Sequence, residues 1–443
     1  MTRSIIEMIH RRGDLSHGFV AERSADVSIA ERGFNRMGLL LAKLGDPQRS
    51  YRTIHVAGSK GKGTTTYIAS ALLTSLGIKT GRYTSPHLLE WNERIAVNDL
   101  AIRDVDFARV LAETETAMQI IETRRPELGT YNAFELLTAA AFLHFWEEQC
   151  DLAVVEVGLG GRFDSTNHVH PLVSVITRIE EEHVDILGPS IRDIAWNKAG
   201  IIKPNTPVVV ADQFAAVDEV IRAEADSVAA PLFQENHEWQ ARRTVDATTI
   251  DIRSVHRLLH CQSLPGEHNL SNIGAALTAV DLAVEGISLA DDQISETLAA
   301  LRIPGRFERR IDPRSGQLLV LDVAHTPESV AALIDAAITA LGMRKFPFIV
   351  GLLSDKPATE ILARIAPVAE HVIFPQLANP RAVNPRELQT IADRINLSST
   401  IAPSILAALA RIPDGSAPLL VTGSFGIVAE CQRALSSRRT FDT

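Results

Sequence analysis

The chain has few cysteines and few aromatic residues, and both shortages limit what the protein can be. Its three cysteines are far apart in the sequence and odd in number, so they fit neither a disulfide framework nor a C-x-x-C metal site. Aromatic residues make up 5% of the 443 residues although 46% are hydrophobic, which is typical of an ordinary soluble α/β protein and not of a disordered chain. We therefore interpret Cys150, Cys261 and Cys431 as core thiols of a protein in a reducing compartment.

The sequence also lacks long hydrophobic runs and an excess of positive charge. No uninterrupted apolar stretch reaches about 18 residues, and Arg3, Glu7 and Arg11 stand where a signal peptide would have its apolar segment. The chain has 44 Lys and Arg residues against 54 Asp and Glu, and its net charge of −10 would repel nucleic acids and anionic lipids. We therefore expect a cytoplasmic protein without a membrane or nucleic-acid partner. No segment resembles an exposed assembly helix, so a monomer is expected.

Short β-branched runs alternate with amphipathic stretches in the first part of the chain. This alternation predicts βαβ units and a largely parallel sheet. The predicted strands are 52–57, 151–157, 172–177 and 207–211. A helix over 64–76 should end at Gly77, one should begin at the capping box of Asn132 and Glu135, and one over 271–285 should end at Gly286. Residues 226–262 are less regular and predict a small antiparallel insert.

The second part of the chain repeats the alternation more tightly, which predicts a doubly wound unit. Its expected strands are 318–323, 348–353, 372–374 and 419–422, and its expected helices are 327–341, 358–366, 385–395 and 425–435. Pro304-Gly305 interrupts both kinds of element, so we place the domain boundary there, between a domain over 1–303 and a domain over 304–443.

The most informative stretch is a loop rich in glycine and lysine between a short strand and a helix. Glycines allow positive φ angles, so backbone N–H groups can point toward one anion, and the helix adds the positive end of its dipole. Lys62 can reach terminal phosphates, and the Thr64 hydroxyl can bind Mg²⁺. Gly63 separates Lys62 from Thr64, unlike in a standard Walker A motif. A plain glycine-rich turn before a surface helix would explain the same stretch without a ligand.

Carboxylates and a lysine follow in the next segments. Glu156 lies at the end of an apolar strand, where burial is costly unless the carboxylate is paired or binds a metal. A Mg²⁺ ligand is one interpretation of Glu156, and an exposed strand end is the other. The cluster 180–183, Glu-Glu-Glu-His, would by itself be a solvated face. Lys198 would by itself be a favourable charge in the last turn of a helix.

Together with other segments, these residues resemble the folylpolyglutamate synthase/dihydrofolate synthase family of the Mur ligase superfamily. The resemblance extends over roughly residues 33–425 and rests on six motifs in order, which is far more specific than the glycine loop alone. The motifs are 58–64, 83–88 with 92–95, 156–167, 194–201, 304–308 and 321–325.

The resemblance implies roles for individual residues. Nucleotide contacts would come from Gly58, Ser59, Gly61, Lys62, Gly63, Thr64, Asn272, Arg306 and Asp322. Two Mg²⁺ ions would be held by Thr64, Ser85, Glu156, His183 and a carbamylated Lys198. Catalytic roles would belong to Lys62, Lys198 and His325, and the pterin side of the substrate would meet Phe34, Arg36, Phe134, Phe163, Asp164 and Ser165.

The fold and reaction implied by the resemblance agree with the layout of the sequence. The implied fold is a Mur-ligase-like P-loop ATP-binding domain with a mostly parallel sheet, followed by a smaller Rossmann-like C-terminal glutamate-ligase domain. The implied reaction uses ATP to join L-glutamate to a folate or to dihydropteroate through an acyl phosphate, because a carboxylate is a poor electrophile. A monovalent cation is a further candidate cofactor, and the expected partners are small-molecule substrates.

Some positions depart from the family pattern, and three competing functions have to be weighed. Glu182 stands where Asp is common, Asn197 where Glu is common, Val323 where Gly is common and Thr326 where Asn is frequent, but none of them is a proposed ligand. A P-loop GTPase is disfavoured because Gly200 stands where a guanine-reading Asn-Lys-x-Asp motif needs Asp. The remaining two competitors are a UDP-muramoyl amino-acid ligase and a non-catalytic nucleotide- or folate-binding paralogue.

Overall fold

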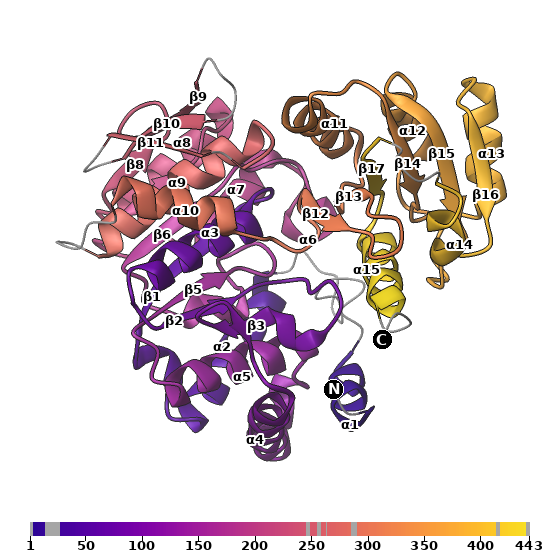
Figure 1. The fold of residues 1–443 in the computed structure, drawn as a ribbon. Coiled ribbons are helices and arrows are strands. Elements are labelled where there is room, and N and C mark those ends of the chain that lie inside the picture. Colours follow the sequence, from indigo (N-terminus) through magenta and orange to yellow (C-terminus); the bar gives the residue numbers. More distant parts are fainter. Residues whose placement is uncertain are drawn as a thin grey trace. The chain divides into compact units, whose positions relative to one another are not determined.

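The computed structural model describes residues 3–13, 27–244, 249–254, 258–262, 264–284, 290–412 and 417–439. Figure 1 traces its helices and strands along the chain. The chain forms two compact units, Met1–Ser263 with Asn269–Leu301 and Leu264–His268 with Arg302–Thr443. Sequence alone placed the boundary between 303 and 304, and no sequence signal indicated that Leu264–His268 groups with the second unit.

An eight-stranded sheet is the framework of the first unit, in the order β4-β3-β2-β5-β1-β6-β7-β8. Its pairs are parallel from β2 to β8, and β3 and β4 add an antiparallel edge. The strands are β1 (Arg52–Ala57), β2 (Thr80–Tyr83), β3 (Ile95–Val97), β4 (Leu100–Ala101), β5 (Leu152–Glu156), β6 (Val173–Ile176), β7 (Val208–Val210) and β8 (Leu232–Gln234). The four predicted strands and the largely parallel sheet are confirmed.

A separate three-stranded sheet follows β8 in sequence. It consists of β9 (Gln240–Arg243), β10 (Thr249–Arg253) and β11 (Leu258–Gln262), and both of its strand pairs are antiparallel. The predicted antiparallel insert in 226–262 is therefore confirmed.

The helices of the first unit pack on the large sheet, on one another or on the three-stranded sheet. They are α1 (Arg3–Arg11), α2 (Val27–Lys43), α3 (Lys62–Ser75), α4 (Asp104–Arg124), α5 (Ala133–Glu147), α6 (Val184–Leu187), α7 (Ile191–Ala199), α8 (Ala215–Ser227), α9 (His268–Ala283) and α10 (Asp291–Ala300). Short 3₁₀ helices are η2 (Pro47–Arg49), η3 (Trp91–Arg94), η4 (Pro126–Leu128) and η5 (Ser165–His168). The helix expected over 271–285 is α9, which spans His268–Ala283, and its expected end at Gly286 lies outside the described residues.

The start of α5 follows the predicted capping box. The Asn132 side chain accepts hydrogen bonds from the backbone N–H groups of Phe134 and Glu135, and the Glu135 side chain accepts one from Asn132 N. The helix then packs closely on β2, where a Cβ atom at Gly81 would lie 2.8 Å from the Phe145 ring. On the other face, α3 packs against β1, β2 and β5. The N-terminal end of α5 at Asn132 and that of α3 at Lys62 are thereby fixed relative to the sheet.

The second unit contains a six-stranded sheet in the order β12-β13-β17-β14-β15-β16, in which only the β12–β13 pair is antiparallel. Its strands are β12 (Glu308–Ile311), β13 (Leu318–Leu321), β14 (Phe346–Val350), β15 (Ala369–Pro375), β16 (Ser399–Ala402) and β17 (Leu419–Thr422). Its helices are α11 (Pro327–Leu341), α12 (Ala358–Ile365), α13 (Pro385–Arg394), α14 (Ile405–Leu409) and α15 (Phe425–Arg439). The four predicted helices are confirmed, whereas β14 begins and ends earlier than the predicted 348–353.

None of the helices in the described ranges is long and apolar enough to cross a membrane.

Candidate active site

The glycine loop lies where β1 passes into α3, and its backbone conformation requires glycine. Gly58 and Gly61 have φ angles of 144° and 90°. A Cβ atom at Gly58 would lie 1.9 Å from Thr177 Oγ1, and one at Gly61 would lie 2.1 Å from Asn272 Oδ1. The loop is therefore enclosed by the residue after β6 on one side and by α9 on the other, with no room for a side chain at either glycine.

The neighbouring strands bring other predicted residues to the same edge of the sheet. β1 lies between β5 and β6, and all three strands run in the same direction. Their carboxyl ends therefore meet, which is the usual place for a ligand in an open parallel sheet. Ser59 joins the loop to the segment after β6, because its hydroxyl donates to Glu180 O at 3.0 Å and accepts from Glu180 N at 3.0 Å.

Two lysines converge on one carbonyl oxygen of the loop. Lys62 Nζ donates to Gly58 O at 2.9 Å, and Lys198 Nζ donates to the same oxygen at 2.8 Å. Lys198 is almost fully buried, with 1% of its surface exposed. The mouth of the loop is thus a concentrated positive site in a chain whose net charge is negative.

The ionisation of Lys198 is shifted by this environment. Burial, and then the charge of Lys62, lower the pKa of Lys198 to about 8, although the Glu182 carboxylate 2.8 Å away opposes the shift. Burial by itself would raise the pKa of Glu182, but Lys198 and Lys62 outweigh it and lower that pKa to about 2. Glu182 is therefore the protein's own counter-ion to this site, and part of the Lys198 population is a neutral amine near pH 8.

Glu156 lies at the end of β5 and faces the start of α3. Its Oε2 accepts a hydrogen bond from Ser85 N at 2.9 Å and lies 3.5 Å from the position that a Cβ atom of Gly63 would occupy. Glu156 is buried, which excludes the exposed strand end considered from sequence. The structure therefore brings Glu156, Ser85 and the first turn of α3, which contains Thr64, into one place.

His183 directly precedes α6 and has a left-handed backbone, with φ of 48°. Such a conformation costs about 1–3 kcal/mol in a residue other than glycine, and it is found at turns as well as at functional sites. Burial lowers the pKa of His183; the charges of Lys198 and Lys62 lower it further, while Glu182 opposes them. The imidazole is therefore neutral near pH 7 and able to act as a ligand.

The donor types fit a hard divalent cation. Hydroxyl and carboxylate oxygens from Thr64, Ser85 and Glu156 are ligands that Mg²⁺ accepts, with water completing its coordination. In the described part of the chain, no group of three or more His, Cys, Asp or Glu side chains is close enough to hold a metal by itself. Hydroxyls and phosphate oxygens would have to complete such a site, which suits an ion that binds together with a nucleotide.

Three predicted nucleotide or catalytic residues lie together in the second unit. Asp322 accepts hydrogen bonds from Phe307 N at 2.7 Å and Ala324 N at 2.9 Å, and burial raises its pKa, an effect that Arg306 opposes. The Arg306 guanidinium lies 5.7 Å from the Phe425 ring centre, and the centre of the His325 ring lies 6.5 Å from the centre of the same Phe425 ring. Sequence reasoning missed Phe425, whose only signal was its place at the start of a predicted helix.

Asn272, the remaining predicted nucleotide residue, lies in the first unit beside the glycine loop. Its Oδ1 lies 3.4 Å from Thr65 Oγ1 and blocks the space next to Gly61.

The residues predicted for the pterin side separate into two groups. Phe34 stacks on His168 of η5 with ring centres 4.0 Å apart, and Phe163 lies 6.1 Å from Trp196. Asp164 caps η5, which begins at Ser165, by accepting from Thr166 N at 2.9 Å. These four predicted residues belong to the loop after Glu156 or contact it.

Arg36 and Phe134 differ from what sequence suggested. Arg36 is held in a bidentate ion pair with Glu135, with Nε–Oε1 and Nη2–Oε2 distances of 2.9 and 2.7 Å, and Phe134 is 1% exposed in the apolar core. The structure uses both side chains for packing and pairing, so their direct contact with a substrate stays a prediction.

The comparisons with known proteins agree over most of the chain. Residues 56–280 match the Mur ligase middle domain, and residues 305–425 match the glutamate ligase domain of Mur ligases. A dihydrofolate synthase/folylpolyglutamate synthase of Bacillus subtilis is 32% identical over 421 residues, covering 91% of this chain and 95% of that protein. One of Mycobacterium tuberculosis is 34% identical over 416 residues, covering 88% of this chain and 84% of that protein.

Solved structures give the same result. The structure of Mycobacterium tuberculosis folylpolyglutamate synthase complexed with ADP has a TM-score of 0.80 and 31% identity, and the match covers 91% of this chain and 94% of that one. The structure of E. coli FolC in complex with DHPP and ADP has a TM-score of 0.76 and 29% identity, over 91% and 93% of the two chains. The expected Mur-ligase-like fold is therefore confirmed.

The fit of the glycine loop can be tested with a pair of alanine variants. Gly61 and Gly77 both have positive φ, 90° and 78°, but no atom lies within 4 Å of a Cβ at Gly77. Each Gly→Ala change costs about 1 kcal/mol for the left-handed backbone, and only Gly61→Ala adds the clash with Asn272. We expect a clearly larger fall in thermal unfolding temperature for Gly61→Ala than for Gly77→Ala. Equal shifts would contradict the close contact between the loop and α9.

Proposed function

The chain belongs to the Mur ligase family, in the branch of the dihydrofolate and folylpolyglutamate synthases, and from this membership we propose that it is an ATP-dependent ligase that adds L-glutamate to a folate, to dihydropteroate, or to both. The observation that carries the proposal is the convergence of Lys62, Lys198 and Glu156 on the mouth of the glycine loop. This arrangement combines a positive site for phosphates with oxygen ligands for a divalent ion.

The proposed chemistry explains why positive charge is needed there. An oxygen of the substrate carboxylate attacks the γ-phosphorus of ATP, the bond to ADP breaks, and an acyl phosphate forms. The amine of L-glutamate then attacks the acyl carbon, loses a proton, and displaces phosphate to leave an amide. The first step brings anions together, and two unit charges about 4 Å apart repel by about 4 kcal/mol at an effective dielectric of 20.

The glycine loop supplies most of the neutralisation in the first unit. Backbone N–H groups and the start of α3 face the phosphates, and Lys62 exchanges its bond to Gly58 O for a phosphate oxygen. Thr64, Ser85, Glu156 and His183 would hold Mg²⁺, which supplies charge neutralisation and orients the phosphates. The strained backbone of His183 supports its place among these ligands.

Lys198 is proposed to be carbamylated. The neutral amine would add to the carbon of CO₂ and release a proton. The resulting carbamate would carry a negative charge on oxygen, where the ordinary lysine carries a positive one, and would supply a ligand for a second Mg²⁺. Its pKa of about 8 makes the amine available for this reaction, and the ion pair with Glu182 must open for it to occur.

The remaining roles follow the predicted positions. Asn272 would contact the nucleotide at the glycine loop of the first unit. Arg306, Asp322 and His325, which belong to the second unit, keep the nucleotide and catalytic roles that the family resemblance implies for them. Phe34, Phe163, Asp164 and Ser165 would face the pterin end of the acid. A monovalent cation, a monomeric state and a cytoplasmic location belong to the same proposal.

The function is tested by measuring glutamate-dependent ADP release with three acids. We expect release with dihydropteroate, with tetrahydrofolate, or with both, and none with a UDP-muramoyl substrate, because the residues around Phe34 and η5 offer aromatic stacking. ADP release with only the UDP-muramoyl substrate would identify a peptidoglycan precursor ligase and overturn the proposal. No release with any acid would favour a non-catalytic paralogue.

Lys198→Ala tests the carbamylation. We expect about a 100-fold loss of kcat, equivalent to about 3 kcal/mol, and partial recovery when acetate supplies the missing carboxylate. Lys203 is a suitable control, because it is a partly buried lysine whose pKa burial also lowers to about 8. Activity lost in Lys203→Ala should not return with acetate. A fully active Lys198→Ala would end the idea of a lysine-derived ligand.

A further inference from the structure

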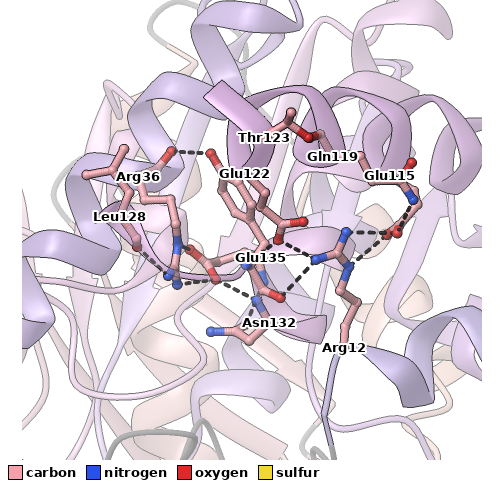
Figure 2. A network of polar contacts seen from close by, with 10 residues as sticks. Arg12, Arg36, Glu115, Gln119, Glu122, Thr123, Leu128, Asn132 and Glu135 are labelled. Atoms are coloured by element: carbon pink, nitrogen blue, oxygen red, sulfur yellow. Dashed lines mark hydrogen bonds and ion pairs between the residues drawn. The ribbon is translucent and has the colours of Figure 1, made fainter. Parts of the chain in front are cut away.

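A network of ion pairs outside the proposed reaction centre joins the N-terminal segment to α4. Arg12 follows α1, and its guanidinium binds both oxygens of Glu115, with Nε–Oε2 at 2.9 Å and Nη2–Oε1 at 2.8 Å. Its Nη1 donates to Glu122 Oε1 at 2.5 Å and approaches Tyr131 O at 3.5 Å. Figure 2 shows Arg12 between the two glutamates, which lie two turns apart on α4.

A second arginine closes the network on the other side. Arg36 of α2 forms its bidentate pair with Glu135 and donates from Nη1 to Leu128 O at 3.0 Å (Figure 2). Its guanidinium also lies 5.1 Å from the centre of the Tyr131 ring. Residues from α2, η4 and α5 are thereby held together.

Tyr131 connects the two arginines. Its backbone N donates to Glu122 Oε1 at 2.8 Å, and its hydroxyl donates to Arg36 O at 2.9 Å. Asn132 N then donates to Glu135 Oε2 at 2.8 Å. Side chains from other elements therefore hold the backbone of 128–132 at Leu128 O, Tyr131 N and Tyr131 O.

Burying these charged side chains costs free energy unless every charge has a partner. Arg12, Arg36 and the three glutamates are each less than one fifth exposed. Burial by itself would lower the pKa of Arg12, but Glu115 and Glu122 outweigh it and raise that pKa. Apolar residues often replace buried ion pairs without loss of stability, so a buried network of this kind is better explained by the geometry that it fixes.

The ion-pair network is connected to the proposed substrate site through α2. Arg36 and Phe34 both belong to α2, and Phe34 stacks on His168 while its carbonyl oxygen lies 2.9 Å from His168 Nε2. η5, which ends at His168, belongs to the loop after Glu156 and packs against both α2 and α5. The segment 128–132 and η5 are therefore linked through one helix.

We propose that Arg12 is a positioning residue for the pterin-bearing acid. Arg12 holds the segment 128–132 and, through Tyr131 and Arg36, the middle of α2 at Phe34. It thereby sets the affinity of the site for that acid without touching the nucleotide loop. The inference rests on the proposed function.

The test compares Arg12→Met with Arg12→Lys and Arg109→Met in the full chain. Arg109 also forms a bidentate pair between α4 and α5, but its partner is Glu147, at the far end of α5 from 128–132. For Arg12→Met we expect the KM of the pterin acid to rise by about tenfold while the KM values of ATP and L-glutamate change by less than about twofold. Arg12→Lys should be intermediate, because an ammonium cannot bind both glutamates bidentately, and Arg109→Met should leave all three values unchanged.

Other outcomes would show whether this inference or the proposed function itself is wrong. An equal rise in all three KM values would show a merely structural role and overturn the inference, as would unchanged values in Arg12→Met. If Arg12→Met does not fold, Glu122→Gln serves instead, since its amide oxygen can still accept from Tyr131 N while the charge facing Arg12 is lost; it must then raise the KM of the acid selectively. Wild-type protein that does not ligate glutamate to either pterin acid would overturn the proposed function itself.

Discussion

The convergence of two lysines on the carbonyl oxygen of Gly58 is the interaction on which the site depends. Lys62 and Lys198 repel one another there, and the charge of Lys62 is one reason for the low pKa of Lys198. Glu182 offsets part of that repulsion. In the proposed enzyme, the anionic oxygens of a polyphosphate would offset the charge of Lys62 and bind the loop N–H groups, while carbamylation would remove the positive charge of Lys198. The loop therefore holds positive charge that an anionic substrate would neutralise.

The surrounding fold fixes where that charge lies. Gly58 has no space for a side chain because Thr177 closes one side of the loop, and Gly61 has none because Asn272 closes the other. The buried Glu156 receives a hydrogen bond from Ser85 N and faces the first turn of α3. Backbone packing therefore places the two lysines at Gly58 and the Glu156 carboxylate at Gly63, on the same loop, where phosphates and a divalent ion would meet both signs of charge.

Much of this arrangement could be predicted from sequence, and the failures have physical reasons. The strand before Gly58 and the cap at Asn132 follow local rules of burial, turn chemistry and hydrogen bonding, and both were predicted. The helix α4 and the strands β12 and β16 were not predicted, since their patterns are short or heavily charged. The ion pair of Arg36 with Glu135, 99 residues away in sequence, was not predicted, and the assignment of Arg36 to the substrate stays a prediction. No local pattern reports such long-range pairs, and the position of Phe425 beside Arg306 was missed for the same reason.

The central claim is that the positive site transfers a phosphoryl group from ATP to a carboxylate. The most direct measurement uses substrate acid labelled with ¹⁸O in the reacting carboxylate and analyses the released phosphate by mass spectrometry. The account predicts one labelled oxygen in each phosphate, because the carboxylate oxygen that attacks phosphorus leaves with it when glutamate adds. Phosphate without label, or label found in AMP, would contradict the acyl-phosphate route.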